Sequence, residues 1–249
     1  MDILTIVPTY ACPFKCNFCY NRNKCDDNSI IDLEKLDSFL EKYSKKFDKI
    51  IISGGEPSLI PTNKLNEIYN VVLKYSNLNI KTFSISTQNI HPLANYDISY
   101  DFIARPRYKE SWANMLEFPN KFDVSITMSP MVFKFYPNKV LQMLNTLPNI
   151  KHLTFRPFFK TEFVRSNIRV EEYKKFINAV EQCKFNLKYT ISFDDLFYGK
   201  QINEYVLNPL GDINIVRFNN EMRTEVKINP KEIGKCETNY PENILICQN

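Results

Sequence analysis

Short apolar runs rich in β-branched residues alternate along this chain with segments whose apolar residues recur at helical spacing. The first run, residues 3–7, is typical of a buried strand. The segment after Asp32 has the spacing of one helix face, and Asp32 can cap its start, as Thr62 can for a later helix. Strands are expected over 3–7, 49–53, 80–87, 96–102, 122–128 and 150–155, and helices from about residues 33, 62, 109 and 137.

Strands that alternate with helices predict a parallel sheet with helices outside it. Right-handed crossovers would curl this sheet, so we expect an α/β fold, a partial (β/α)6 TIM-like barrel with a short C-terminal extension. The barrel is expected over residues 1–185. The extension, residues 186–249, would pack on it with a strand at 188–193 and a hairpin at 207–218. Ligands of such sheets lie at the carboxyl ends of the strands.

Composition and charge exclude several classes of protein. Hydrophobic residues make up 44% of the 249 residues, which is enough for a core and excludes a disordered chain. The net charge of +4 comes from 32 basic and 28 acidic residues without a basic stripe, so a nucleic-acid partner is disfavoured. No apolar stretch approaches a membrane span and no secretory signal begins the chain, so we expect a cytoplasmic protein without a membrane partner.

Three of the seven cysteines carry the main chemical signal. An odd number fits a disulfide framework poorly, and clustered cysteines in a cytosolic chain more often bind metal. Cys12, Cys16 and Cys19 have the spacing C-x3-C-x2-C soon after the first strand. An iron–sulfur cubane normally takes four cysteines, so three would leave one iron open for catalysis. A zinc site with Cys25 as its fourth ligand is the alternative.

A glycine turn follows the second strand and reads Ser53, Gly54, Gly55, Glu56 and Pro57. Two adjacent glycines allow positive φ angles and let the backbone approach a ligand closely. Exposed carbonyls in such a turn can accept hydrogen bonds from a charged amino group. The simpler interpretation is a connection from a strand to a helix.

The cysteine loop resembles the cluster-binding motif of the radical S-adenosylmethionine (SAM) superfamily, C-x3-C-x-φ-C, in which φ is aromatic. Phe18 occupies the φ position, and Tyr20 follows the third cysteine as it often does in that family. The glycine turn resembles the family's GGEP motif, which contacts the amino group of SAM. The resemblance implies that the three cysteines bind a [4Fe-4S] cluster whose fourth iron binds SAM.

By this resemblance the protein is an enzyme in which one electron from an oxygen-sensitive cluster cleaves SAM. The 5′-deoxyadenosyl radical that results would abstract hydrogen from a peptide or a small metabolite. An electron donor such as flavodoxin or ferredoxin would reduce the cluster. The expected hairpin is loosely similar to one in the extensions of peptide-modifying relatives. Two alternatives stay open: the same chemistry on a nucleoside or nucleic acid, and a non-enzymatic zinc or iron–sulfur binding module.

Four residues of the later strands are further candidates for binding SAM: Thr87, Ser99, Thr127 and Arg156. The turn at Thr87 departs from the Thr-Asn-Gly-like pattern of the family, whereas Ser99 lies in a segment that resembles its fourth-strand Ser-φ-Asp pattern. Thr127 belongs to the fifth expected strand. Arg156 ends the sixth and could pair with the SAM carboxylate, and a structural ion pair is the competing interpretation.

The remaining cysteines are candidates for an auxiliary cluster. Cys183 falls on an expected amphipathic helix, which favours core packing. Cys25, Cys236 and Cys247 could together form a partial site, but the C-terminal segment has too few cysteines for a complete closed cluster.

Overall fold

A single ten-stranded sheet organises the chain in the computed structural model, which describes residues 2–14, 19, 21–75, 82–86, 100–104, 122–127, 145, 150–156, 170–182, 190–193, 203–219 and 222–235. The strands are β1 (Asp2–Ile6), β2 (Lys49–Ile52), β3 (Thr82–Ser86), β4 (Tyr100–Ala104), β5 (Phe122–Thr127), β6 (Ile150–Arg156), β7 (Thr190–Phe193), β8 (Asn203–Leu207), β9 (Ile213–Asn219) and β10 (Met222–Lys227). Their order across the sheet is β10-β9-β8-β1-β2-β3-β4-β5-β6-β7. Neighbours from β8 to β7 are parallel, and the pairs β8–β9 and β9–β10 are antiparallel.

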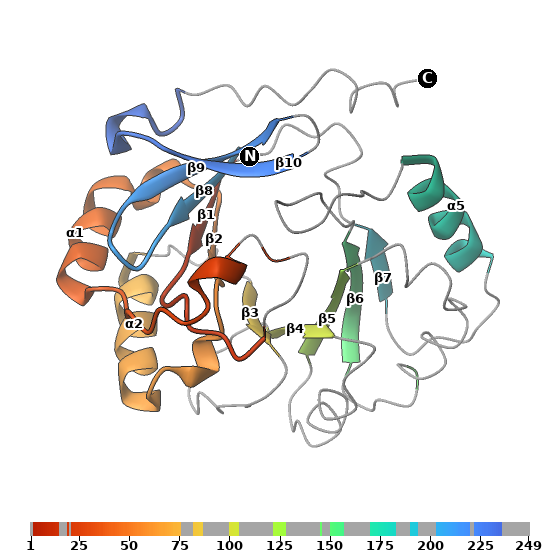
Figure 1. The fold of residues 1–249 in the computed structure, drawn as a ribbon, viewed down its shortest axis with the longest axis horizontal. Helices are drawn as coiled ribbons and strands as arrows, with labels where there is room; N and C mark the ends of the chain where they lie inside the picture. The colour runs from red at the N-terminus through yellow and green to blue at the C-terminus, as the bar shows by residue number, and fades with distance from the viewer. Residues whose placement is uncertain are drawn as a thin grey trace.

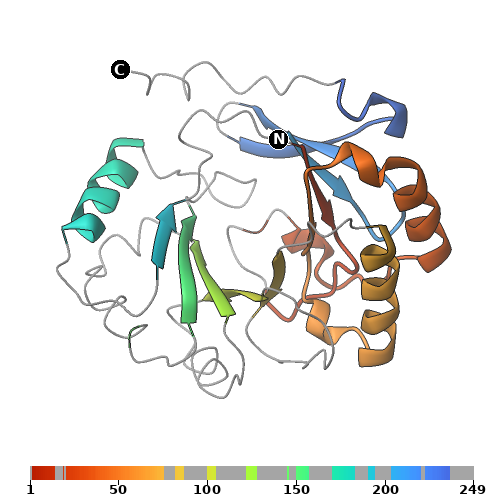
Figure 2. The same ribbon diagram turned by 180° about the vertical axis from the view of Figure 1, so that it is seen from behind.

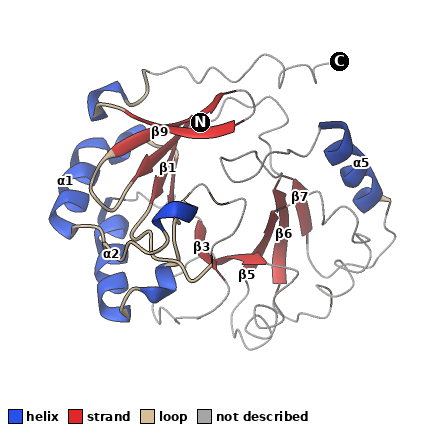
Figure 3. Ribbon diagram, viewed as in Figure 1, coloured by secondary structure: helices blue, strands red, loops and turns tan. Residues whose placement is uncertain are grey.

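The described helices connect or follow these strands, and Figure 3 distinguishes them in blue. The α-helices are α1 (Leu33–Tyr43), α2 (Thr62–Tyr75) and α5 (Val170–Glu181). The 3-10 helices are η1 (Arg22–Lys24), η2 (Ser44–Lys46), η3 (Pro57–Leu59) and η5 (Pro230–Glu232). None of the described helices is long and apolar enough to cross a membrane.

The strands follow one another along an open arc from β9 through β1 and β3 to β7 (Figure 1). Helices α1 and α2 lie outside one limb of the arc and α5 lies outside the other, and the view from behind agrees (Figure 2). A curved parallel sheet with helices on its outer side confirms the expected α/β class and partial barrel.

Helices α1 and α2 form where the spacing of apolar residues predicted them. Leu36, Phe39 and Leu40 are buried on α1, and the corresponding face of α2 is buried as well. Asp32 caps α1, since its carboxylate accepts hydrogen bonds from the backbone N–H groups of residues 34 and 35 at 2.9 and 3.0 Å. The prediction that Thr62 caps α2 is wrong by one residue: Leu65 N–H donates to the Pro61 carbonyl, which makes Thr62 the first helical residue.

Most of the expected strands are present, with two differences. Strand β4 is described over Tyr100–Ala104, so it extends two residues past the expected end at residue 102. Strand β10 was not predicted, because only Met222 and Val226 of its six residues MRTEVK are apolar and it lies at the end of the sheet. The helices expected from residues 109 and 137 lie outside the described residues.

The strands after residue 186 continue the main sheet. The expected hairpin is confirmed as β8 and β9, although β8 pairs on its other side with β1, in parallel. Tyr205 of β8 is fully buried, packs edge-on against Phe47 with ring centres 5.6 Å apart, and accepts a hydrogen bond from Gly234 N–H at 3.0 Å. Strand β8 is therefore part of the core beside α1 and η2.

The carboxyl ends of β8, β1 and β2 lie level with one another. Ile6 is in register with Ile52 on one side and with Leu207 on the other. The next residues remain joined, because Ser53 N–H donates to the Ile6 carbonyl at 2.9 Å and Val7 N–H to the Leu207 carbonyl at 2.8 Å. Three loops consequently leave the sheet side by side: the cysteine loop, the glycine turn, and the turn between β8 and β9.

Candidate functional site at the ends of strands β8, β1 and β2

The cysteine loop, residues 12–25, is closed at its base by its own backbone. Cys12 N–H donates to the Cys25 carbonyl at 3.0 Å, and Arg22 N–H donates to the Cys19 carbonyl at 3.2 Å. Cys12 and Cys19 are both half-buried, so each thiol is near the surface without being fully exposed. Cys16, Phe18 and Tyr20 lie outside the described residues.

Cys25 differs from Cys12 and Cys19 because its side chain is almost completely buried, with 4% exposed. Its sulfur lies 3.7 Å from the Phe14 carbonyl oxygen and 3.5 Å from the Asn21 carbonyl oxygen. A protonated thiol can donate to such acceptors, whereas the thiolate that a metal requires would face two negative carbonyl dipoles. The buried position of Cys25 therefore favours a thiol that holds the loop closed by hydrogen bonding, rather than a zinc ligand.

The glycine turn packs directly on the segment that leads into the cysteine loop. Gly54 has φ +135°, and a Cβ there would lie 2.4 Å from the Val7 side chain. A Cβ at Gly55 would lie 2.4 Å from the Ala11 carbonyl oxygen and 2.6 Å from that of Tyr10. Contacts this short with backbone atoms explain why only glycine fits at Gly55.

Two backbone hydrogen bonds fix the distance between the glycine turn and the cysteine loop. Gly55 N–H donates to the Thr9 carbonyl at 3.0 Å, and Glu56 N–H donates to the Ala11 carbonyl at 2.6 Å. Thr9 is itself ordered, because its hydroxyl accepts from Ala11 N–H at 3.1 Å. The residue immediately before Cys12 is thereby held against the turn.

Glu56 directs its carboxylate into the protein rather than toward solvent. It is fully buried, and its Oε1 accepts hydrogen bonds from the Ser58 N–H at 3.1 Å and the Ser58 hydroxyl at 2.6 Å. Glu56 thereby caps η3, and Pro57 occupies the first helical position, which suits its fixed φ. In the described contacts these two residues stabilise the turn.

Tyr10 was not identified from the sequence, yet it lies where all three loops meet. Its side chain is 3% exposed and belongs to a buried cluster with Val7, Val206 and Val216. The ammonium of Lys24 lies 4.7 Å from the centre of its ring. Burial, and then the nearby Glu225 carboxylate, raises the pKa of Tyr10 to about 12, so the phenol is neutral at physiological pH.

Two of the later candidate residues lie at strand ends, as expected. Thr127 and Arg156 are the last residues of β5 and β6 and are register partners. Thr87 and Ser99 lie outside the described residues, as do Cys183, Cys236 and Cys247.

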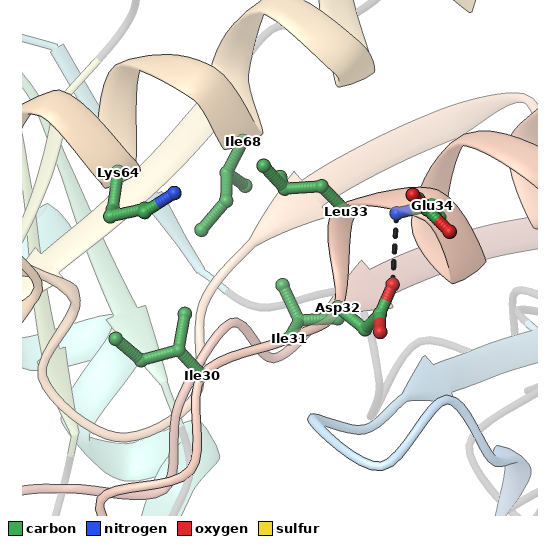
Figure 4. Close-up of a pocket in the computed structure, with 7 residues that line it drawn as sticks. All are labelled: Ile30, Ile31, Asp32, Leu33, Glu34, Lys64 and Ile68. Atoms are coloured by element: carbon green, nitrogen blue, oxygen red, sulfur yellow. Dashed lines mark hydrogen bonds between the residues drawn. The ribbon is translucent and has the colours of Figure 1, made fainter.

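A hollow elsewhere on the surface contains none of the candidate residues. It lies between the start of α1 and the face of α2, and Figure 4 draws its lining residues Ile30, Ile31, Asp32, Leu33, Glu34, Lys64 and Ile68. Lys64 in its wall is paired with Glu67 at 2.8 Å. Because Asp32 is engaged as the cap of α1, this hollow offers few uncommitted polar groups.

The residues at the strand ends fit a bound iron–sulfur cluster and a small ligand beside it. Two half-buried thiols lie on one closed loop. The glycine turn packs against the segment that leads into that loop. Among the described residues no three His, Cys, Asp or Glu side chains form a metal-binding group, and Cys16 is not among those residues. The thiolates of Cys12 and Cys19 are the donors that iron–sulfur clusters use.

Comparison with known proteins assigns the class. The sequence matches the radical SAM superfamily over residues 6–204 of its 249 residues. The chain therefore belongs to the radical SAM superfamily, a group of enzymes that use a [4Fe-4S] cluster and S-adenosylmethionine.

Similar individual proteins are more distant. SuiB of Streptococcus suis, crystallised with S-adenosylmethionine, has a TM-score of 0.62 at 14% identity, over 85% of this chain and 59% of SuiB. A radical SAM methyltransferase from Sphaerobacter thermophilus has a TM-score of 0.53 at 12% identity, over 75% of this chain and 64% of that protein. At such identities the likeness concerns the fold alone, and it agrees with the partial barrel.

One curated sequence is similar over a shorter stretch. A Methanocaldococcus jannaschii protein, provisionally named a glycyl-radical enzyme activating enzyme, is 41% identical over 69 residues, which are 27% of this chain and 25% of that protein. The chain thus matches a quarter of this relative's length and 59% of the length of SuiB.

Proposed function

We propose that the chain binds a [4Fe-4S] cluster through Cys12, Cys16 and Cys19 and uses it with SAM to carry out radical chemistry on a substrate. The junction of the cysteine loop with the glycine turn carries this proposal, because the two backbone hydrogen bonds to Thr9 and Ala11 hold the motifs together. When bound, the cluster supplies the electron that cleaves SAM, and the radical so formed removes hydrogen from the substrate.

The residues of this chain have distinct roles in the proposal. Three cysteines hold the cluster and leave one iron open for SAM. The carbonyls of Gly54 and Gly55 accept hydrogen bonds from the SAM amino group, and Glu56 and Pro57 hold the turn that presents them. We assign the remaining SAM contacts to Phe18, Tyr20, Thr87, Ser99, Thr127 and Arg156.

We further propose a peptide as the substrate, with a small metabolite as the alternative. SuiB has been crystallised with the precursor peptide SuiA, and the archaeal relative is named as an activator of another enzyme. An electron donor such as flavodoxin or ferredoxin, a cytoplasmic location and an oxygen-sensitive cluster belong to the same proposal. So does a division after residue 185 into a barrel and a C-terminal extension, whose strands join the barrel sheet beside β1 and β6.

The first experiment is an anaerobic iron count with an EPR spectrum of the reduced protein, recorded with and without SAM. We expect about four irons per chain, a spectrum that changes when SAM is added, and release of 5′-deoxyadenosine with dithionite. Zinc without iron, or an iron-loaded protein that never cleaves SAM, would overturn the proposal.

The ligand set is tested by single substitutions with a matched control. Cys12→Ala, Cys16→Ala and Cys19→Ala should each abolish cluster binding and SAM cleavage. Cys25→Ser keeps a hydrogen-bond donor for the carbonyls of Phe14 and Asn21, so it should still take up about four irons. Loss of iron from Cys25→Ser, with iron retained by Cys16→Ala, would show that the ligands are assigned wrongly.

The substrate class is tested by the rate at which 5′-deoxyadenosine forms. Mixed peptides should raise this rate above the substrate-free level, whereas nucleosides and short RNA should leave it unchanged. Stimulation by RNA that weakens steeply with salt would instead favour the nucleic-acid alternative.

A further inference from the structure

The C-terminal strands contact the segment that leads into the cysteine loop at the side chain of Tyr10. The turn between β8 and β9 leaves the sheet beside the first residues of the loop, where Val7 N–H donates to the Leu207 carbonyl. In Figure 1 strand β8 lies next to β1, with β9 and β10 beyond it, whereas β7, the strand that precedes β8 in the sequence, lies on the opposite limb of the arc. Tyr10 projects into this region and packs with Val206 of β8 and Val216 of β9.

The backbone of Tyr10 contacts the glycine turn at the same time. A Cβ added at Gly55 would lie only 2.6 Å from the carbonyl carbon and oxygen of Tyr10. The carbonyls of its neighbours Thr9 and Ala11 accept hydrogen bonds from the backbone N–H groups of the glycine turn. A shift of Tyr10 would therefore move both the turn and the residue that precedes Cys12.

A third contact joins Tyr10 to the far end of the cysteine loop. Lys24 of η1 lies over its ring, and the neighbouring Cys25 carbonyl accepts the hydrogen bond from Cys12 N–H. Close by, Glu225 of β10 is held by Asn214 of β9 at 3.2 Å. The ring of Tyr10 is thus enclosed by elements from both ends of the chain.

We propose that Tyr10 is a positioning residue through which the strands β8 and β9 hold the cysteine loop and the glycine turn in the arrangement that binds SAM. The mechanism is packing: the ring fills the space between Val206, Val216 and the loop, and its loss leaves a cavity into which the loop can shift. This inference rests on the proposed function, because it assumes that the loop holds the cluster.

The test compares two substitutions of buried tyrosines in the full-length, anaerobically reconstituted protein. Tyr10→Leu should weaken SAM binding about tenfold and alter the EPR change that SAM produces, while the iron count remains near that of the wild type. Tyr69→Leu is the matched control, since Tyr69 is a tyrosine buried to a similar extent but lies on α2. It should lower the melting temperature but change SAM affinity less than about twofold.

Two further variants separate packing from other effects of Tyr10. Val216→Ala alters only the β9 side of the cluster and should weaken SAM binding in the same direction by a smaller factor. It also provides the test if Tyr10→Leu does not fold. Tyr10→Phe keeps the ring and should bind SAM like the wild type; a loss as large as that of Tyr10→Leu would overturn packing as the mechanism.

The outcomes distinguish this inference from the proposed function. If the wild type binds iron and cleaves SAM but Tyr10→Leu and Val216→Ala bind SAM as tightly as Tyr69→Leu does, the role of Tyr10 is wrong and the function stands. If the wild type binds no iron, the proposed function fails and takes this inference with it.

Discussion

At the scale of single residues, Gly55 is constrained by its neighbours rather than by an unusual φ angle. We expect Gly55→Ala to push the glycine turn away from the Ala11 carbonyl, because its Cβ would lie 2.4 Å from that oxygen. Such overpacking should cost about 1–3 kcal/mol of stability and reduce iron uptake and SAM binding. Urea unfolding and an iron count after reconstitution measure the two effects.

Gly234→Ala is the control for this prediction. Gly234 has φ +78°, so an alanine costs about 1–2 kcal/mol, but the nearest atom to its Cβ would be 3.8 Å away. This variant should lose similar stability and still bind iron normally. Equal iron uptake by both variants would mean that the close contact at Gly55 does not matter for the site.

The residues found from the sequence alone are those whose chemistry is visible over a few positions. The three cysteines and the glycine turn stand in short motifs. The turn contacts the segment that leads into the cysteine loop, as expected for loops that follow adjacent strands. Tyr10 could not be found this way, because its partners Val206 and Val216 are about two hundred positions away. The closing role of Cys25 depends likewise on the path of the loop backbone.

At the scale of elements, the start of α1 depends on a single cap. Asp32→Ala removes the acceptor of two backbone N–H groups and should lower the free energy of unfolding by about 1 kcal/mol. Asp32→Asn, which keeps an acceptor, should lose much less. Urea denaturation measures both changes. SAM affinity should stay unchanged, since the cap lies at the hollow between α1 and α2, which contains none of the candidate site residues (Figure 4).

Element prediction succeeded where burial imposes a clear pattern. Apolar faces are packed in the core on strands β1 and β2 and on helices α1 and α2. The spacing of apolar residues in the sequence therefore predicts these elements. Strand β10 has no such face: Val226 is 49% exposed, and the strand exists because its backbone pairs with β9. Local sequence carries little information about such an edge strand.

At the scale of the whole molecule, β1 is the strand that joins the two ends of the chain. It pairs with β2 on one side and with β8 on the other, and the cysteine loop follows it directly. The sequence predicted the parallel sheet but not this pairing, because nothing within residues 203–207 indicates which edge of the sheet they join.

Hydrogen exchange tests how far the site depends on that pairing. Because β1 is paired on both sides, its amides should be among the slowest to exchange, and those of β10 at the end of the sheet should exchange faster.

A chain that ends after residue 202 lacks β8, so its β1 should lose protection and its cysteine loop should no longer take up iron. A chain that ends after residue 235 keeps every strand of the sheet and serves as the control. If the shorter chain still protects β1 and binds about four irons, the first two hundred residues form the site unaided. Loss of both in the shorter chain alone would mean that the C-terminal strands are needed to build the site.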